Sequence, residues 1–528
     1  MVDKVHTRVA STRDIAVVTA SVLAVMTACF WGTGSDDVGT GFFPGHVWVV
    51  DHLAEMLTGD HPPTSYTERI GAPEGVDLRF IGWASLIVAA PLSLLMGAIW
   101  ATWIVTGLNL VVSWLVTQAL LRRLIPTGAT LLPAALYVLS PFALGLLANG
   151  QLAKLSLWCL PWLLLEVDKG VRDPGSPWWL VRVLMAAVLM GFTSPSIALV
   201  MPLALLLWLL ARRGTIVRMV LAAGASAAGL IPALWYHSVQ SGAASGLSPA
   251  SAIPGLRSPP QLSPVMTWSS FIGDAPRWDI STMGVNNVSL VGPLALVLVA
   301  AAIVWRLRKS WVGILLFAGG AVFAFGPDLH LSDLDLRMPA YGLEVAGYPL
   351  TKSGMYYRFV QVAFLGLAIC GSALLQTRAW SLRAGVGAIM VGCLAFNAWS
   401  TRTLWPRKTV THASDPLYAT MREDPAPGGV LEFPLSHHDT TGEIRVLAQL
   451  RHRRPTSGTS QNVVRQGNPR LERLYRKAVG SRAAEALRAE GFAYVLLHLP
   501  SKNLRLREAL TSSLGSGIEA PGLVYWKL

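Results

Sequence analysis

The feature that most constrains this chain is a series of long apolar runs separated by short basic clusters. Eleven runs have the roughly 17–25 residues needed to cross the hydrocarbon core of a bilayer. Each run predicts a transmembrane helix, because backbone polar groups in hydrocarbon must be satisfied within the segment itself. The sequence therefore predicts a polytopic α-helical membrane protein, with spans at residues 15–33, 100–121, 126–148, 151–167, 178–193, 195–211, 216–237, 288–305, 310–326, 357–376 and 384–400.

Charged residues divide the chain into two parts. Residues 1–400 contain 43 charged positions, whereas the 128 residues from 401 to 528 contain 30. This indicates a membrane domain over 1–400 and a domain of soluble composition over 401–528. The net charge of +13 would suit a nucleic-acid partner. However, the basic residues of the body lie in clusters between apolar runs, which is typical of membrane topology, and we expect no nucleic-acid partner.

One further apolar run, from Phe80 to Gly97, decides the topology. If this run crosses the membrane, Arg122, Arg123 and every later basic cluster fall outside. If it is re-entrant or interfacial, the predicted cytoplasmic segments hold 16 basic and 5 acidic residues, as the positive-inside rule requires. Pro91 and Gly97 interrupt the run, which favours the second choice. We therefore predict a cytoplasmic N-terminus, an external C-terminal domain, and long external loops at 34–79, 238–287 and 327–356.

The C-terminal domain reads as a small α/β unit. Alternating and buried-type apolar patterns predict strands over 429–434, 493–498 and 523–527, and helices over 471–490 and 504–514. The chain contains no Walker A sequence and no dinucleotide-binding glycine fingerprint, so nothing in it supports nucleotide chemistry. The four cysteines lie inside apolar runs without metal-ligand spacing and are interpreted as small buried hydrophobes. The predicted functional site is therefore external and built from other residue types.

An ordered set of short motifs runs through the chain. These are Ser35-Asp-Asp-Val-Gly39, Gly71-Ala-Pro-Glu-Gly75, Asn109, Ala148-Asn-Gly-Gln-Leu152, Leu157-Trp-Cys-Leu-Pro161, Thr193-Ser-Pro195, Phe325-Gly-Pro327, Tyr348-Pro349, Tyr357-Arg358, Leu431-Glu-Phe-Pro-Leu435 and Leu487-Arg-Ala-Glu-Gly-Phe-Ala-Tyr-Val495. In this order the set resembles the polytopic bacterial YfhO-like proteins of the GT-C glycosyltransferase superfamily. The resemblance covers nearly the whole chain.

The resemblance implies a multi-pass enzyme of the bacterial cytoplasmic (inner) membrane. Such an enzyme transfers a sugar from a polyprenyl-phosphate-linked donor to an extracytoplasmic acceptor of one of three kinds: a cell-envelope glycan, a lipid or a protein. GT-C enzymes usually place an acidic residue just beyond the first span, and here that position matches Asp36 or Asp37. A general base there would take the proton from the acceptor hydroxyl, and cations would stabilise the departing lipid phosphate.

Asp36 and Asp37 are thus the predicted catalytic residues. Their side chains point opposite ways on an extended segment, so one can face the site while the other caps a turn. The alternative is two solvated loop acids. A divalent cation, Mg²⁺ or Mn²⁺, bridging the pair would need further oxygen ligands, and the sequence offers no obvious third ligand.

Five other residues are candidates for substrate binding. Arg358 and Lys352 flank the last external loop, where a lipid phosphate head group would lie, and the alternative for both is interfacial snorkelling. Lys154 is a charge near the outer end of a predicted span, which marks a functional candidate or a second snorkelling residue. Tyr357 fits an interfacial aromatic belt or a platform that stacks on a sugar. His46 is a secondary candidate.

His46 lies near the start of the segment from Gly45 to Leu57, whose apolar residues recur at helical spacing. We predict an amphipathic helix at the external interface. Asp51 and Glu55 share one face of this helix at i,i+4 spacing, and we interpret that face as solvated.

Three functions remain open from the sequence. The first is a GT-C glycosyltransferase acting on the external face. The second is a catalytically silent relative that scaffolds envelope polymer assembly. The third is a transporter or flippase for a lipid-linked sugar, although the chain lacks the internal symmetry expected of one.

Overall fold

The structure is a computed structural model of the 528-residue chain. It describes residues 11–30, 37–39, 43–64, 66–72, 75–77, 83–126, 129–148, 150, 152–172, 178–212, 214–243, 293–324, 328–331, 334–346, 356–400, 409–411, 416–433, 448–457, 469–498, 504–520 and 523–528.

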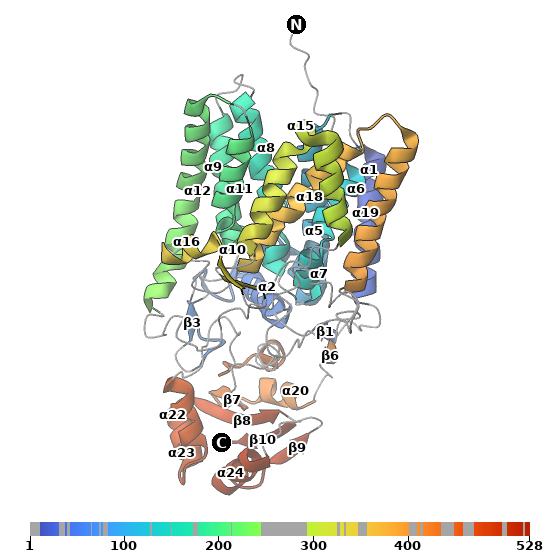
Figure 1. Cartoon of the computed structure of the whole chain (residues 1–528). Coiled ribbons are helices and arrows are strands. Elements are labelled where there is room, and N and C mark those ends of the chain that lie inside the picture. The colour runs from blue at the N-terminus through green and yellow to red at the C-terminus, as the bar shows by residue number, and fades with distance from the viewer. Residues whose placement is uncertain are drawn as a thin grey trace.

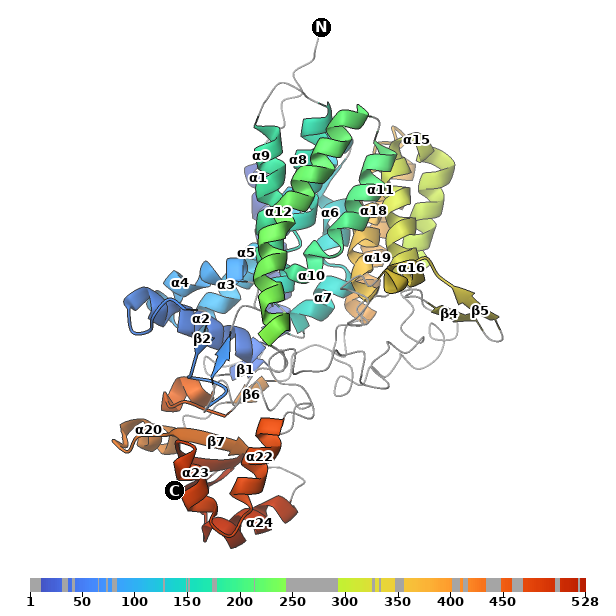
Figure 2. The same cartoon turned by 90° about the vertical axis from the view of Figure 1, so that its left-hand side faces the viewer.

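A bundle of apolar helices forms the body of the molecule (Figures 1 and 2). Its helices are α1 (Thr12–Phe30), α5 (Ala98–Leu124), α6 (Leu131–Val138), α7 (Pro141–Ala148), α8 (Cys159–Arg172), α9 (Trp179–Thr193), α10 (Pro195–Ala198), α11 (Met201–Ala211), α12 (Ile216–Ala243), α15 (Pro293–Ala324), α18 (Val360–Leu374) and α19 (Trp380–Ser400). Helix α15 kinks at Arg306, which has non-helical backbone angles. Its packing against α18 and the packing of α9 against α12 are the most extensive in the bundle.

Each of the eleven predicted spans contains a described helix, but the predicted count of eleven is not confirmed. Three of the described helices are long and apolar enough to cross a membrane alone: Ala98–Leu124, Ile216–Tyr236 and Trp380–Trp399. The consecutive helices α6 and α7 meet at 49° and could together make a fourth span. Others, such as α9, α11 and α18, are apolar but shorter. These helices are apolar enough for a membrane span, but they are shorter than the roughly 17–25 residues that a span needs.

The run from Phe80 to Gly97 forms two short helices, α3 (Trp83–Ile87) and α4 (Ala89–Met96). Neither is long enough to cross a bilayer. Gly97 then has a positive φ of 83° and separates α4 from the long helix α5. Figure 2 places α3 and α4 beside one end of the bundle rather than through it.

The two ends of the bundle differ in chemistry. At the end that we call the basic end, Arg122 on α5 pairs with Asp14 on α1 at 2.6 Å. Buried Asp168 on α8 pairs there with Arg123, Arg172 and Arg212 at 3.1, 3.6 and 2.7 Å. We call these four residues the Asp168 cluster. All of these basic residues were predicted to be cytoplasmic, and the structure places them together at one end.

The C-terminal part is a four-stranded sheet with helices packed on it, at the other end of the bundle, which we call the domain end (Figure 1). The strand order is β7-β8-β10-β9, with β7 parallel to β8 and the remaining pairs antiparallel. The strands are β7 (Gly429–Phe433), β8 (Phe492–His498), β9 (Ile518–Ala520) and β10 (Leu523–Lys527), and the helices are α20 (Pro416–Glu423), α22 (Pro469–Ala478), α23 (Ala483–Ala489) and α24 (Leu504–Leu514).

Most of the predicted elements of this domain are confirmed, with one correction. The expected helix over 471–490 is two helices, α22 and α23, because the chain turns at Val479 to Arg482, where Gly480 lies. The expected strands over 429–434, 493–498 and 523–527 are β7, β8 and β10, and the helix over 504–514 is α24.

The first loop of the body is joined to the C-terminal part by backbone pairing. Strand β1 (Asp37–Gly39) pairs antiparallel with β6 (Thr409–Thr411), so that Asp37 lies opposite Thr411. Ile70 forms a parallel bridge with Thr456, which in turn bridges to Val430 of the domain sheet. The described parts of loop 34–79 and of residues 401–528 therefore meet at the same end of the bundle. That they share one side of the membrane stays a prediction.

Candidate functional site

Asp37 of the predicted acidic pair lies at the domain end of the bundle. Asp37 is the first residue of β1, and β1 packs against α2 (Phe43–Thr58). Asp36 lies outside the described residues, and only the backbone of Asp37 is described. The pairing of β1 with β6 fixes the backbone path of the acidic loop. The catalytic role of the pair and a Mg²⁺ or Mn²⁺ ion on it stay predictions.

Lys154 lies in a short 3₁₀ helix, η1 (Leu152–Leu155), that follows α7. The segment after η1 is fixed by polar contacts. The side chain of Asn109 on α5 accepts hydrogen bonds from Ser156 Oγ and Trp158 Nε1, both at 3.1 Å. The hydroxyl of Tyr137 donates to the carbonyl of Leu157 at 3.0 Å. Asn109 thus fixes the segment that directly follows η1, the short helix that carries the half-buried Lys154.

Arg358 lies in a second 3₁₀ helix, η4 (Tyr356–Phe359), which leads directly into α18. The side chain of Arg358 is only 7% exposed. Helix α15 passes close to η4 because Gly320 has no side chain: a Cβ there would lie 2.9 Å from the carbonyl oxygen of Phe359. An arginine that snorkels from a lipid-facing helix would be exposed, so the burial of Arg358 argues against that alternative.

The structure brings Lys154 and Arg358 within electrostatic reach of each other although they are far apart in the sequence. The positive charge of Arg358 acts on the ammonium group of Lys154. Two cations near each other form a natural site for an anion with several oxygens, such as a phosphate. Of the other substrate-binding candidates, Lys352 lies outside the described residues, and only the backbone of Tyr357 is described, next to Arg358 in η4.

Helix α2 confirms the predicted amphipathic helix but corrects the interpretation of its acidic face. His46 is half-buried on the first turns of this helix. The side chains of Asp51 and Glu55 are 19% and 21% exposed and are engaged in ion pairs. The face is not solvated, because a segment of the C-terminal part covers it.

Two arginines from distant parts of the chain bind these acids. Arg453 Nη1 lies 2.7 Å from Asp51 and 2.6 Å from Glu55. Arg69 is 8% exposed, pairs with Glu55, and lies 3.6 Å from Asp51. We call these four residues the joint network. Two acids and two arginines balance in charge, which makes their partial burial tolerable.

Neutral contacts support the joint network. Gln449 Oε1 accepts hydrogen bonds from Trp48 Nε1 at 2.7 Å and from Arg69 at 2.9 Å. The guanidinium of Arg69 also lies over the Trp48 ring, 5.6 Å from its centroid. Helix α2, residue 69 and the segment 448–457 therefore form one connected unit between the bundle and the domain.

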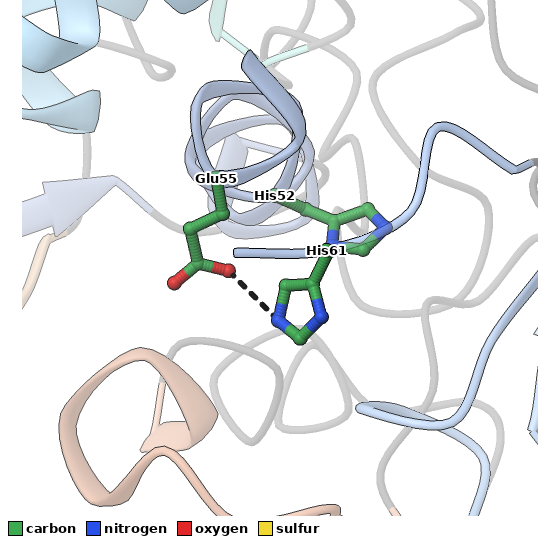
Figure 3. Close-up of side chains that lie close together, drawn as sticks. All are labelled: His52, Glu55 and His61. Carbon is green, nitrogen blue, oxygen red and sulfur yellow. Dashed lines mark ion pairs between the residues drawn. The ribbon is translucent and has the colours of Figure 1, made fainter. Parts of the chain in front are cut away.

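Beside the joint network lies a group of three potential metal ligands (Figure 3). His52, Glu55 and His61 offer ligand atoms that all lie within 4.8 Å of one another, the only such group among the residues that the structure describes. Burial lowers the pKa of His52 to about 3, and the charge of Arg69 and the proximity of His61 act in the same direction. His52 is therefore a neutral imidazole at physiological pH.

A second buried polar group lies inside the C-terminal domain. Glu432 on β7 is fully buried and lies 2.7 Å from Nε2 of His498 on β8 and 3.8 Å from Nε2 of His452. Thr456 donates its hydroxyl hydrogen to the same carboxylate. Burial alone would raise the pKa of Glu432, but the hydrogen bonds and charges of the two histidines hold it well below its ordinary range. This group connects β7 and β8 to the segment that carries Arg453.

Several of these residues were not predicted from the sequence. Arg69, Gln449 and Arg453 carry no motif, and His61 has no ligand spacing that stands out. The sequence offered one indication of a site here, the i,i+4 spacing of Asp51 and Glu55. This spacing puts the two acids on the same face of a helix, as in a site with paired acids.

Sequence comparison gives no relative for this chain. No model of a known protein family matches it, so the YfhO-like assignment is not confirmed. No curated protein matches it either.

Structural comparison does find similar proteins. The mycobacterial arabinofuranosyltransferase AftD superposes with a TM-score of 0.55 at 14% identity, over 99% of this chain and 40% of AftD. The Archaeoglobus fulgidus oligosaccharyltransferase AglB, in complex with an inhibitory peptide and a dolichol-phosphate, superposes with a TM-score of 0.53 at 9% identity, over 97% of this chain and 74% of AglB. The chain thus spans about two fifths of the length of AftD. Both are glycosyltransferases of the GT-C superfamily, and the fold of this chain is similar to theirs.

Proposed function

We propose that this chain is a membrane glycosyltransferase that moves a sugar from a polyprenyl-phosphate-linked donor to an extracytoplasmic glycan, lipid or protein acceptor. The observation that carries the proposal is the buried cation Arg358 on η4, whose charge acts on Lys154 on η1. The GT-C-like fold supports it, and the AglB structure holds a dolichol-phosphate, a carrier of the same chemical class as the proposed donor. The domain end would face the outside of a bacterial cytoplasmic membrane, with the N-terminus inside.

In this proposal the two cations hold the lipid phosphate. As the bond between the anomeric carbon and the phosphate oxygen breaks, negative charge develops on the phosphate. Lys154 and Arg358 stabilise that charge, and the planar fork of the arginine suits two phosphate oxygens. The burial of Arg358 strengthens the interaction, because charges attract more strongly away from water.

The acidic pair supplies the base. Asp36 or Asp37 takes the proton from the acceptor hydroxyl as that oxygen attacks the anomeric carbon. The β1–β6 pairing keeps the loop at the end of the bundle where the external head group of a lipid carrier would lie. If a divalent cation takes part, carboxylate oxygens of this pair are the ligands that Mg²⁺ or Mn²⁺ prefers.

The test is transfer of labelled sugar by purified protein, with a panel of polyprenyl-phosphate sugars that includes an arabinofuranosyl donor. At least one of Asp36→Asn and Asp37→Asn should lower the rate ~10²–10⁴-fold, the usual contribution of a positioned general base. Arg358→Gln should weaken donor binding. Its matched control is Arg337→Gln, since Arg337 stacks on Tyr341 at 4.2 Å instead.

Full transfer by the Asp36→Asn/Asp37→Asn double variant would show that this loop is not catalytic. Unchanged donor affinity in Arg358→Gln would remove the phosphate site. An inactive wild type with every donor would favour the scaffold over the enzyme.

A further inference from the structure

We propose that His52, Glu55 and His61 form a zinc site at the C-terminal end of α2. This site uses neither residue of the acidic pair and does not depend on the proposed sugar transfer. It would hold a borderline transition metal ion, Zn²⁺, through two imidazole nitrogens and one carboxylate oxygen.

The distances suit this metal. Nε2 of His61 lies 3.3 Å from Oε2 of Glu55. Two ligand atoms bound to a tetrahedral zinc ion at its usual bond lengths are about 3.3 Å apart. All three ligand atoms lie within 4.8 Å of one another, so small side-chain adjustments within the group bring them to zinc-binding separations. Two histidines and a glutamate are a known zinc ligand combination that leaves a fourth position open.

His52 gives an independent indication of a ligand. It is 2% exposed, yet within the described part of the chain neither of its ring nitrogens has a hydrogen-bond partner. An unsatisfied buried polar group costs on the order of 1–3 kcal/mol, so a buried imidazole with two unmet nitrogens calls for a missing partner. Its ring is held in place by stacking on Trp48, with centroids 5.1 Å apart and planes 14° apart.

The backbone brings the third ligand into position. His52 and Glu55 share a face of α2 at i,i+3 spacing. The helix ends at Thr58, and Gly59 adopts a φ of 86°, which reverses the chain at little cost only for glycine. The amide of Asp60 then donates to the carbonyl of Glu55 at 3.0 Å, and the amide of His61 points at the same carbonyl. His61 is thereby folded back over Glu55, as Figure 3 shows.

The neighbouring charges are compatible with a metal. Glu55 uses Oε1 for Arg453 and Oε2 for Arg69, and each carboxylate oxygen has a second lone pair for another partner. The two arginines would then orient the ligating carboxylate, as outer-shell partners commonly do. Imidazole ligands favour zinc over Mg²⁺ or Mn²⁺, which prefer oxygen. The ion would fasten the turn after α2 to the helix that carries the joint network.

The test uses the full-length protein without a polyhistidine tag, stripped with EDTA and titrated with ZnCl₂ by calorimetry. We expect one zinc ion per chain. Replacement by CoCl₂ should give the intense visible absorption of four-coordinate cobalt, and excess MgCl₂ should not displace the ion. His61→Ala should weaken zinc binding at least about 10-fold. Its matched control is His46→Ala, which removes a histidine from the same helix outside the group, and should bind as the wild type does.

Equal zinc affinity in His61→Ala and the wild type would overturn the proposal, as would a wild type that binds no zinc. If His61→Ala does not fold, zinc-edge X-ray absorption of the wild type decides. Imidazole scattering with nitrogen and oxygen ligands near ~2.0 Å supports the site. A zinc spectrum without imidazole overturns it.

Discussion

The Asp168 cluster and the joint network use the same ion pairs for different purposes at opposite ends of the bundle. In the Asp168 cluster, one carboxylate that is 1% exposed gathers three arginines that all belong to the helical body. In the joint network, two half-buried acids on α2 meet Arg453, which is 39% exposed and belongs to the C-terminal part.

Burial decides what each network can do. A buried pair loses much if one partner is removed, because the other charge is left without compensation. A pair open to water loses little, because solvent replaces the partner. The basic end is therefore built to stay closed, whereas the ion pairs of Arg453 in the joint network can open at low cost.

The largest expected effect is at the basic end. Asp168→Asn should destabilise the protein by about 3–5 kcal/mol, because three arginines lose their shared anion in a buried site. Thermal unfolding in detergent is the measurement. The matched control is Glu519→Gln, which also breaks an arginine pair, with Arg507, but on a side chain that is 68% exposed. Equal melting temperatures for both variants would contradict the contrast.

An intermediate effect is expected from pH on Glu432, which supports the segment behind the joint. Its pKa in the folded protein lies below the ordinary value of 4.5, so its contribution is complete above about pH 4.5 and is lost as the pH falls below it. We expect a loss on the order of 2 kcal/mol, the size of a charge-assisted hydrogen bond.

Hydrogen exchange of the β7 and β8 amides at neutral and acidic pH measures this loss. In Glu432→Gln the same amides should exchange faster at neutral pH and should lose the acid-dependent step. An acid step that survives in Glu432→Gln would mean that other groups carry it.

The smallest expected effect is at the joint itself. Arg453→Ala should cost about 1 kcal/mol or less in global stability, because the pair is partly exposed. It should nevertheless increase protease cleavage near residue 453, since the ion pair is a direct side-chain link between α2 and that segment. The Arg507→Ala control should leave this cleavage unchanged. A drop in stability as large as that of Asp168→Asn would show that the two networks are alike.

The parts of the fold that depend on local patterns could be predicted from the sequence. The apolar composition of 493–498 and of 429–434 predicted the right strands, because each pattern reports burial of its own segment. Helix α2 followed from the spacing of Val47, Val50 and Leu53. The expected helix over 471–490 was broken by a turn, since its periodic pattern continues on both sides of Gly480.

The candidate site was less accessible because it is made by contacts across the chain. Lys154 was found as a charge near the end of a predicted span and Arg358 as a cation beside the last external loop. Nothing in the sequence indicated that the charge of one acts on the other. The acids of α2 were read as solvated because a helix pattern cannot show that Arg453, far along the chain, covers them. His61 becomes a partner of His52 only through the left-handed turn at Gly59.

The pairing of β1 with β6 has a consequence for how the molecule is made. Asp37 emerges early from the ribosome, while its partner Thr411 emerges only after the last helix of the bundle. At ordinary rates of translation the first strand waits on the order of half a minute for the second. Until then the acidic loop has no backbone partner in β6, so a nascent chain halted anywhere within the bundle would carry the acids without the strand that holds them in place.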